Sequence, residues 1–191
     1  MNHARALFLD RDGVINLNHG YVHTREHFDF VDGIFDVCHK AKRWEYLLIV
    51  VTNQAGIGRG YFSEEDFHRL TDWMLEQFRH RDAGISKVYF CPYHPEHGIG
   101  EYKRESPCRK PNPGMLLAAA SDFDLDLAAC VLVGDKASDV EAGRTAGVGC
   151  NVLYVPGSTP SLIGPTIGHL AELEEFLRPP TLPEGTPRDA A

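Results

Sequence analysis

The chain has 191 residues, of which 43% are hydrophobic and 24% charged, and its formal net charge is −8 at pH 7. This length suits one α/β domain with a hydrophobic core, and the composition is that of an ordinary globular protein. The negative charge argues against a broad nucleic-acid surface, and no apolar stretch approaches a membrane span. The first residues also lack a signal-peptide pattern, so we expect a cytoplasmic protein with no nucleic-acid or membrane partner.

The first predicted element is a buried strand over residues 6–9, which ends in Asp10, Asp12 and Gly13. A short apolar run closed by a turn signal is typical of such a strand. Two carboxylates so close together are costly unless a cation or a reaction uses them. Ligands bind at the carboxyl ends of strands in open α/β sheets, which makes both aspartates candidate site residues. Taken alone, the pattern fits an Asp-rich turn equally well.

Strands and helices alternate along the rest of the chain, which predicts an α/β fold with a doubly wound parallel sheet and helices on both faces. One helix begins with the capping-box-like Ser63-Glu-Glu-Asp66, and another has Asn112 as its cap and Pro113 at its first position. We expect residues 1–178 to form one domain and the Pro-rich residues 179–191 a flexible tail. The predicted strands cover residues 47–52, 87–91, 130–133 and 150–155, and the predicted helices cover 33–43, 63–80, 112–122, 138–146 and 168–177.

Three later segments add polar side chains at the expected ligand-binding edge of the sheet. They are Thr52-Asn53-Gln54, Cys108-Arg109-Lys110-Pro111, and Gly134-Asp135-Lys136 with Ser138-Asp139. Together with the first two aspartates, these motifs resemble in order and context the haloacid dehalogenase superfamily of phosphohydrolases, over residues 6–155. The resemblance implies a Rossmann-like core. The gaps on either side of Thr52 are too short for the cap domain that many such phosphatases carry. The site should therefore be open, roofed only by the loops 16–32 and 92–108.

The chemistry of phosphoryl transfer gives each of these residues a role. Asp10 would be the nucleophile that forms an aspartyl phosphate, and Asp12 the general acid and base. Thr52 would donate to the phosphoryl oxygens, and Lys110 would neutralise charge. Mg²⁺, which prefers oxygen ligands, would be held by Asp10, the backbone carbonyl of Asp12, and Asp135, with Lys136 and Asp139 in support. The alternatives are ordinary helix-start acids at Asp135 and Asp139 and a solvated cation at Lys110.

Within the superfamily, residues 18–21, 52–60, 91–95 and 108–115 resemble the D-glycero-D-manno-heptose 1,7-bisphosphate 7-phosphatases. This resemblance implies removal of the 7-phosphate of a small sugar bisphosphate, in the synthesis of ADP- or GDP-activated heptose for surface polysaccharide. We expect the protein to be a monomer, although the sequence does not fix the oligomeric state. A histidinol-phosphate phosphatase and an inactive binding module are the alternatives. Arg59 and Arg109 are candidates for the second phosphate, because a guanidinium can grip phosphate bidentately, although Arg59 also fits a surface turn. The implied substrate contacts are Asn18, His19, Gly20, Tyr21, Asn53, Gln54, Ala55, Arg59 and Arg109.

One departure from this family concerns zinc. Its members commonly bind a structural zinc through Cys-x-His and Cys-x-Cys, but the corresponding positions here are Cys91, Tyr93, Ser106 and Cys108. Tetrahedral structural zinc takes four nitrogen or sulfur ligands, and two of them are missing. We therefore expect no structural zinc and two neighbouring free thiols. A site rebuilt with His94 is the alternative.

Overall fold

The computed structural model describes residues 3–158 and 165–178, so the predicted tail at 179–191 lies outside the described residues. The strands are β1 (Arg5–Leu9), β2 (Tyr46–Asn53), β3 (Lys87–Cys91), β4 (Val131–Gly134), β5 (Cys150–Tyr154) and β6 (Thr166–Ile167). The α-helices are α1 (Ile34–Arg43), α2 (Ala55–Gly58), α3 (Glu64–Arg79), α4 (Gly114–Phe123) and α5 (Ala137–Ala146). Short 3₁₀ helices are η1 (Arg25–His27), η2 (Gly100–Tyr102), η3 (Leu127–Ala129) and η4 (Leu170–Glu175).

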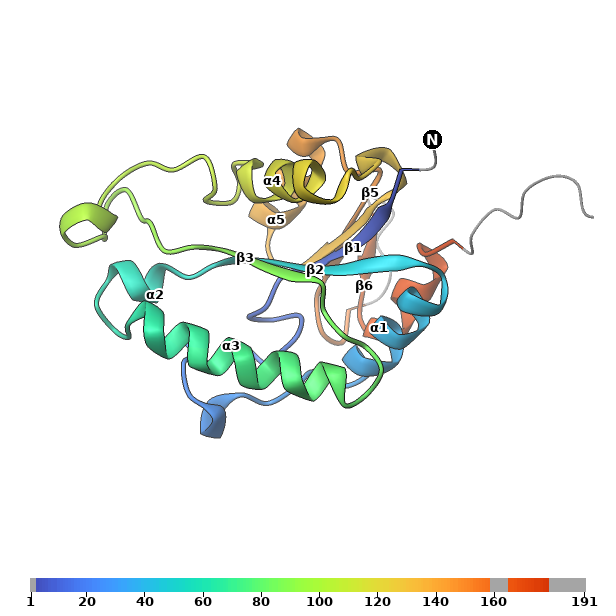
Figure 1. Cartoon of the computed structure of the whole chain (residues 1–191), viewed down its shortest axis with the longest axis horizontal. Helices are drawn as coiled ribbons and strands as arrows, with labels where there is room; N and C mark the ends of the chain where they lie inside the picture. The colour runs from blue at the N-terminus through green and yellow to red at the C-terminus, as the bar shows by residue number, and fades with distance from the viewer. Residues whose placement is uncertain (1–2, 159–164, 179–191) are drawn as a thin grey trace, which may run out of the picture.

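The strands form one parallel six-stranded sheet in the order β3-β2-β1-β4-β5-β6. Helices α1 and α3 cover one face, and α4 and α5 cover the other (Figure 1). Successive side chains of a strand point to opposite faces, so Leu7 and Leu9 pack with α1 and α3, whereas Ala6 and Phe8 pack with α4 and α5. The predicted doubly wound parallel sheet is confirmed.

The start of α3 follows the sequence prediction. The Ser63 hydroxyl accepts a hydrogen bond from the Asp66 amide at 3.1 Å, and the Ser63 amide donates to the Asp66 carboxylate at 2.9 Å. This reciprocal pair satisfies two backbone N–H groups that the helix leaves free. The predicted capping box is therefore confirmed.

The predicted cap of α4 is wrong. The helix begins at Gly114 with Pro113 before it, and the side chain of Asn112 donates instead to the carbonyl of Ser106 at 2.9 Å. The Gly114 amide donates to the Pro107 carbonyl at 2.8 Å. Residues 106–114 thus fold back on themselves, and the Asn112 amide stabilises that turn rather than the helix.

The connections around the sheet are short. Between β1 and β2 lie only η1 and α1, and the described residues between β2 and α4 hold α2, α3, β3 and η2. Neither connection adds a second folded unit over the carboxyl ends of the strands, as the spacing predicted. No helix among the described residues is long and apolar enough to cross a membrane.

Candidate active site

The candidate site lies where the strand order reverses, between β1 and β4. The chain leaves the carboxyl ends of these neighbouring strands at Asp10 and Asp135, and Thr52 lies at the end of β2 on the other side of β1. The Asp10 amide continues the sheet pairing by donating to the Val133 carbonyl at 3.1 Å. A reversal point of this kind opens a crevice at the strand ends, which is where ligands bind in such sheets.

Lys110 lies at the centre of this crevice. Its ammonium is 3.0 Å from Asp10 and 2.6 Å from Asp139, and it donates to the Val51 carbonyl at 2.7 Å. Burial alone would lower the pKa of Lys110, but the two carboxylates outweigh it and the net shift is upward. Lys110 is only 4% exposed, so the alternative of a solvated cation is wrong.

Asn53 fixes the backbone of Lys110. Its side-chain amide donates to the Lys110 carbonyl at 3.0 Å and accepts from the Lys110 amide at 3.1 Å. Both ends of the Asn53 side chain are therefore engaged within the protein. The sequence interpretation placed Asn53 against substrate and did not anticipate this link between β2 and the lysine.

Three carboxylates gather beside Lys110. Oxygen atoms of Asp10, Asp135 and Asp139 all lie within 4.8 Å of one another. The Oδ1 atom of Asp135 is buried without a hydrogen bond, and the nearest cation is the Lys136 ammonium at 3.4 Å. Burial, and after it the charge of Asp10, raises the pKa of Asp135 to about 6. An under-satisfied oxygen in a cluster of hard oxygen donors fits a divalent cation such as Mg²⁺.

Gly13 makes room for this cluster. Its φ angle is +104°, and a Cβ atom there would lie 2.3 Å from Oδ2 of Asp135. Only glycine meets both the left-handed backbone and the close approach. The turn that follows Asp10 and Asp12 therefore depends on this residue.

Asp12 is held by three side chains. Arg11 donates to both of its oxygens, Gln54 donates to Oδ2 at 2.8 Å, and Asn16 donates to Oδ1 at 3.1 Å. Gln54 also donates to the Thr52 hydroxyl at 3.0 Å, which joins the two predicted catalytic positions. Arg11 and Asn16 were not among the predicted site residues.

A cavity of about 520 Å³ opens above these groups. His19, by contrast, is half-exposed and pairs with Asp29 at 2.9 Å, so it does not line the cavity. His94 lines it, and burial, with the positive charge of Arg109, lowers its pKa. The cavity is lined by Asp12, Asn18, Gly20, Tyr21, Asn53, Gln54, Ala55, Gly56, Arg59, His94, Arg109, Lys110, Pro111, Lys136 and Ser138.

Comparison with known proteins places this geometry in a family. Residues 107–161 match a family model described as HAD-hydrolase-like. The D-glycero-alpha-D-manno-heptose-1,7-bisphosphate 7-phosphatase of Burkholderia mallei is 66% identical over 149 residues, which are 78% of this chain and 79% of that protein. The chain belongs to the heptose-bisphosphate phosphatase family of the haloacid dehalogenase superfamily.

Other members of the family agree in sequence and structure. The D-glycero-beta-D-manno-heptose-1,7-bisphosphate 7-phosphatase of Vibrio cholerae is 51% identical, covering 80% of this chain and 82% of that protein. A crystal structure of the D,D-heptose 1,7-bisphosphate phosphatase of B. bronchiseptica, complexed with magnesium and phosphate, superimposes with a TM-score of 0.76 at 25% identity. That match covers 90% of this chain and 97% of the other.

Two of the four positions at which the resemblance implies zinc ligands carry Tyr93 and Ser106. The Ser106 hydroxyl lies 2.9 Å from Sγ of Cys108. Interaction with the neighbouring Cys91 thiol is the main reason that the pKa of Cys108 falls to about 6. Nδ1 of His94 accepts from the amides of Glu96 and His97, so that nitrogen serves the loop itself.

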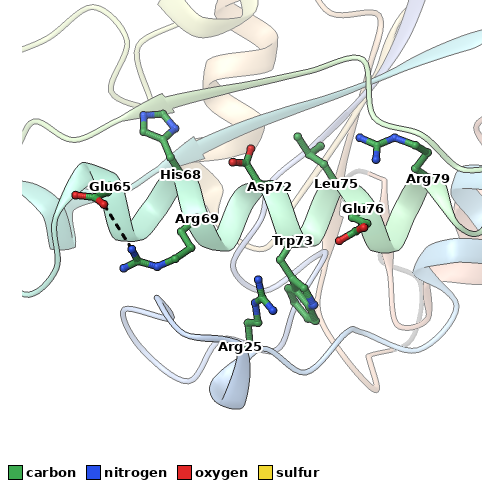
Figure 2. A pocket seen from close by; sticks show the side chains of 9 residues that line it. All are labelled: Arg25, Glu65, His68, Arg69, Asp72, Trp73, Leu75, Glu76 and Arg79. Atoms are coloured by element: carbon green, nitrogen blue, oxygen red, sulfur yellow. Dashed lines mark ion pairs between the residues drawn. The ribbon is translucent and has the colours of Figure 1, made fainter.

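Another surface cavity lies away from the strand ends. Figure 2 shows the side chains that line a groove along α3, with Arg25 of η1 reaching toward it. The volume of this groove is about 600 Å³. Acidic and basic side chains alternate along it, as in the 3.7 Å pair of Glu65 and Arg69. No strand end contributes to this groove, so it is not a candidate active site.

Proposed function

We propose that the protein is a Mg²⁺-dependent phosphatase that removes the 7-phosphate of D-glycero-D-manno-heptose 1,7-bisphosphate through an aspartyl phosphate on Asp10. One observation carries the proposal. The Lys110 ammonium lies between Asp10 and Asp139, in the cluster that also holds the under-satisfied Asp135. The chain that carries this cluster is 66% identical over 149 residues to the heptose-bisphosphate phosphatase of Burkholderia mallei. An inactive binding module would not need this arrangement of buried charges.

The side chains of Asp10 and Asp135 and the backbone carbonyl of Asp12 would hold Mg²⁺. When bound, the ion supplies positive charge that polarises the phosphoryl oxygens. Asp139 instead accepts from the Lys136 amide at 3.0 Å and pairs with Lys110, so it orients the lysine. The magnesium in the B. bronchiseptica structure supports this proposal.

The chain's own residues account for the two half-reactions. A carboxylate oxygen of Asp10 attacks phosphorus, the bond from phosphorus to the sugar oxygen breaks, and Asp12 gives that oxygen a proton. Water then attacks the aspartyl phosphate and gives its proton to Asp12, which releases phosphate and restores Asp10. Lys110 offsets the negative charge throughout, and the Thr52 hydroxyl donates to the phosphoryl group.

The second phosphate of the substrate would bind at the cationic side of the cavity. Of its lining residues, Arg59, Arg109, Lys110 and Lys136 carry positive charge and only Asp12 carries negative charge. Nε of Arg59 is buried without a partner, and Arg109 uses Nη1 to donate to the Tyr93 carbonyl at 3.2 Å. This excess of cations favours a bisphosphate over histidinol phosphate, whose ammonium group it would repel.

We also propose that the α-anomer is the preferred substrate, because the relative named for it is 66% identical and those named for the β-anomer are 45–51% identical. The protein would act as a cytoplasmic monomer that supplies nucleotide-activated heptose, since one chain contributes every residue of the site. The anomer of the 1-phosphate that the enzyme prefers would decide whether its product leads to GDP-heptose or to ADP-heptose.

The deciding experiment measures phosphate release, with Mg²⁺ and with EDTA, from five compounds. These are the two anomers of the heptose bisphosphate, the heptose 7-phosphate, histidinol phosphate and fructose 1,6-bisphosphate. We expect the highest kcat/KM for the α-bisphosphate, release of one phosphate per sugar, and no turnover with EDTA. Preference for histidinol phosphate, or turnover unchanged by EDTA, would contradict the proposal.

A further inference from the structure

We propose that Arg11 is a positioning residue for the acid and base Asp12, and that Gln54 occupies the position on the Asp12 carboxylate that the leaving oxygen takes during turnover. The inference rests on the proposed phosphatase function. It assigns roles to two side chains that both donate hydrogen bonds to the Asp12 carboxylate.

The burial of Arg11 is the first observation. Its side chain is 1% exposed and heads the largest fully buried side chains of the described residues. A guanidinium in such a place is costly unless its charge is paired. Its charged partner is Asp12, reached from Nη2 at 2.9 Å and 2.8 Å and from Nε at 3.3 Å. Nη2 also donates to the Val22 carbonyl at 2.7 Å, and Nη1 has no partner.

The saturation of Asp12 is the second observation. Oδ1 accepts from Arg11 and Asn16, and Oδ2 accepts from Arg11 and Gln54. A carboxylate oxygen has two lone pairs, so both oxygens are occupied. Before Asp12 exchanges a proton with a sugar oxygen or a water molecule, one of these donors must leave.

Gln54 is the donor that can leave. Its hydrogen bond to Oδ2 comes from a neutral amide, whereas those of Arg11 are charge-assisted and about twice as strong. Gln54 also lines the cavity, so a ligand can displace its amide, whereas Arg11 lies beneath the cavity floor. Oδ2 therefore faces the reacting groups, and Arg11 holds the rest of the carboxylate still while Gln54 moves aside.

A purely structural role for Arg11 makes a different prediction. The bond to Val22 ties down the loop that follows β1, and the Arg11 carbonyl accepts from the amides of Val14, Ile15 and Asn16. If Arg11 served only that loop, its loss would lower stability and activity whatever stands at position 12. If it acts through Asp12, its loss has no further effect once Asp12 cannot exchange protons.

A double-mutant cycle on the full chain with Mg²⁺ separates these roles. We expect Asp12→Asn to lower kcat/KM for the heptose bisphosphate by about 10²–10⁴-fold, the usual contribution of a general acid. Arg11→Met should cost at least about tenfold, and Arg11→Met with Asp12→Asn should stay within about threefold of Asp12→Asn alone. Arg11→Lys should recover part of the loss, because an ammonium pairs with one oxygen but not with two. Arg25→Met, an exposed arginine, is the matched control and should retain full activity.

A second substrate supplies a readout that a structural defect would not change. An aryl phosphate such as p-nitrophenyl phosphate has a leaving group that needs no proton, so Arg11→Met should cost less in kcat/KM on it than on the heptose bisphosphate. The inference would be overturned if the fold-losses in kcat/KM of the two single variants multiply in the double variant. It would also be overturned if Arg11→Met loses the same factor in kcat/KM on both esters. Neither result would contradict the phosphatase function. If the wild-type protein hydrolyses neither of the two esters, the proposed function is wrong and this inference fails with it. Thermal unfolding of each variant shows that the fold is retained.

Discussion

Asp10 carries the most direct test of the chemistry. Its carboxylate lies 3.0 Å from the Lys110 ammonium at the end of β1. We expect Asp10→Asn to abolish turnover while substrate binding, measured by calorimetry, stays close to that of the wild type. Loss of a nucleophile costs several orders of magnitude, so activity above about one per cent would contradict a covalent mechanism.

Lys110 also bears on stability. Lys110→Met leaves the Asp10 and Asp139 carboxylates buried without their cation, and such losses cost about 3–5 kcal/mol in the free energy of unfolding. Urea denaturation in EDTA measures this. The matched control is Lys87→Met, which breaks the 2.6 Å pair of Lys87 with Asp122. Its expected cost is much smaller, because water and salt screen an exposed ion pair. Equal costs for the two variants would mean that burial of the Lys110 pair has no energetic consequence.

Substitution of Arg109 tests whether this residue binds the second phosphate of the substrate. Arg109→Ala should reduce kcat/KM for the bisphosphate by about 10–100-fold, since hydrogen bonds to charged groups contribute about 1.5–3 kcal/mol. The same variant should lose little on the heptose 7-phosphate, which lacks the second phosphate. Equal losses on the two substrates would mean that Arg109 serves the loop through its bond to the Tyr93 carbonyl.

At the scale of elements, hydrogen bonds and an aromatic contact hold the loop over residues 92–108 in place. The His94 amide donates to the Tyr102 carbonyl at 3.1 Å, the Ile99 amide to the Gly58 carbonyl at 2.8 Å, and the Tyr102 hydroxyl to Glu64 at 3.1 Å. Arg104 stacks over the Tyr93 ring at 3.9 Å. These contacts tie the loop to α2 and α3.

We therefore expect the purified protein to contain well under one zinc per chain, as measured by elemental analysis. Cys108 should be alkylated by iodoacetamide at pH 7 before any other cysteine, because its pKa is lowered to about 6 and it is partly exposed. Cys38, whose pKa is raised by burial, is the internal control. One tightly held zinc that is lost in His94→Ala would establish a rebuilt site instead.

The sequence predicts most elements well because their signals are periodic and local. In α3 the apolar residues recur at helical spacing, and all but Leu75 of the set Phe67, Leu70, Met74, Leu75 and Phe78 are buried. The predicted last helix is a 3₁₀ helix, and β6, with two residues, is too short to leave a pattern. Asn112 was misassigned because its partner, the Ser106 carbonyl, comes from a turn that no local pattern encodes.

The same limit applies to the candidate site. Asp10, Asp135 and Lys110 could be found because each follows or precedes an element whose edge the sheet topology fixes. Arg11 could not, because an arginine between two aspartates is typical of an exposed turn, and only the fold shows that its side chain is buried. The hydrogen bonds of Asn53 to Lys110 likewise join residues far apart in the sequence.

At the scale of the whole molecule, we expect magnesium and protons to compete for Asp135. Its pKa of about 6 lies above its ordinary value of 3.8, so without metal the folded state binds the proton more tightly than the unfolded state. The metal-free protein should therefore lose stability as the pH rises from about 4 to about 6. Mg²⁺ needs the carboxylate, so its affinity should be about tenfold lower at pH 5 than above pH 7. Thermal unfolding across this range, with EDTA and with Mg²⁺, measures both trends, and an affinity independent of pH would contradict the role of Asp135.

The strand order also sets when the site comes into being during synthesis. Strands β1, β2 and β3 leave the ribosome first and are neighbours in the sheet, whereas β4 must return to the far side of β1. A nascent chain that has reached α3 already contains Asp10, but Lys110, Asp135 and Asp139 have yet to be made. Domains fold as their chain is completed. The proposed nucleophile is therefore among the first residues translated, and a chain that ends with α3 holds Asp10 without the lysine and the later carboxylates that the proposed chemistry needs.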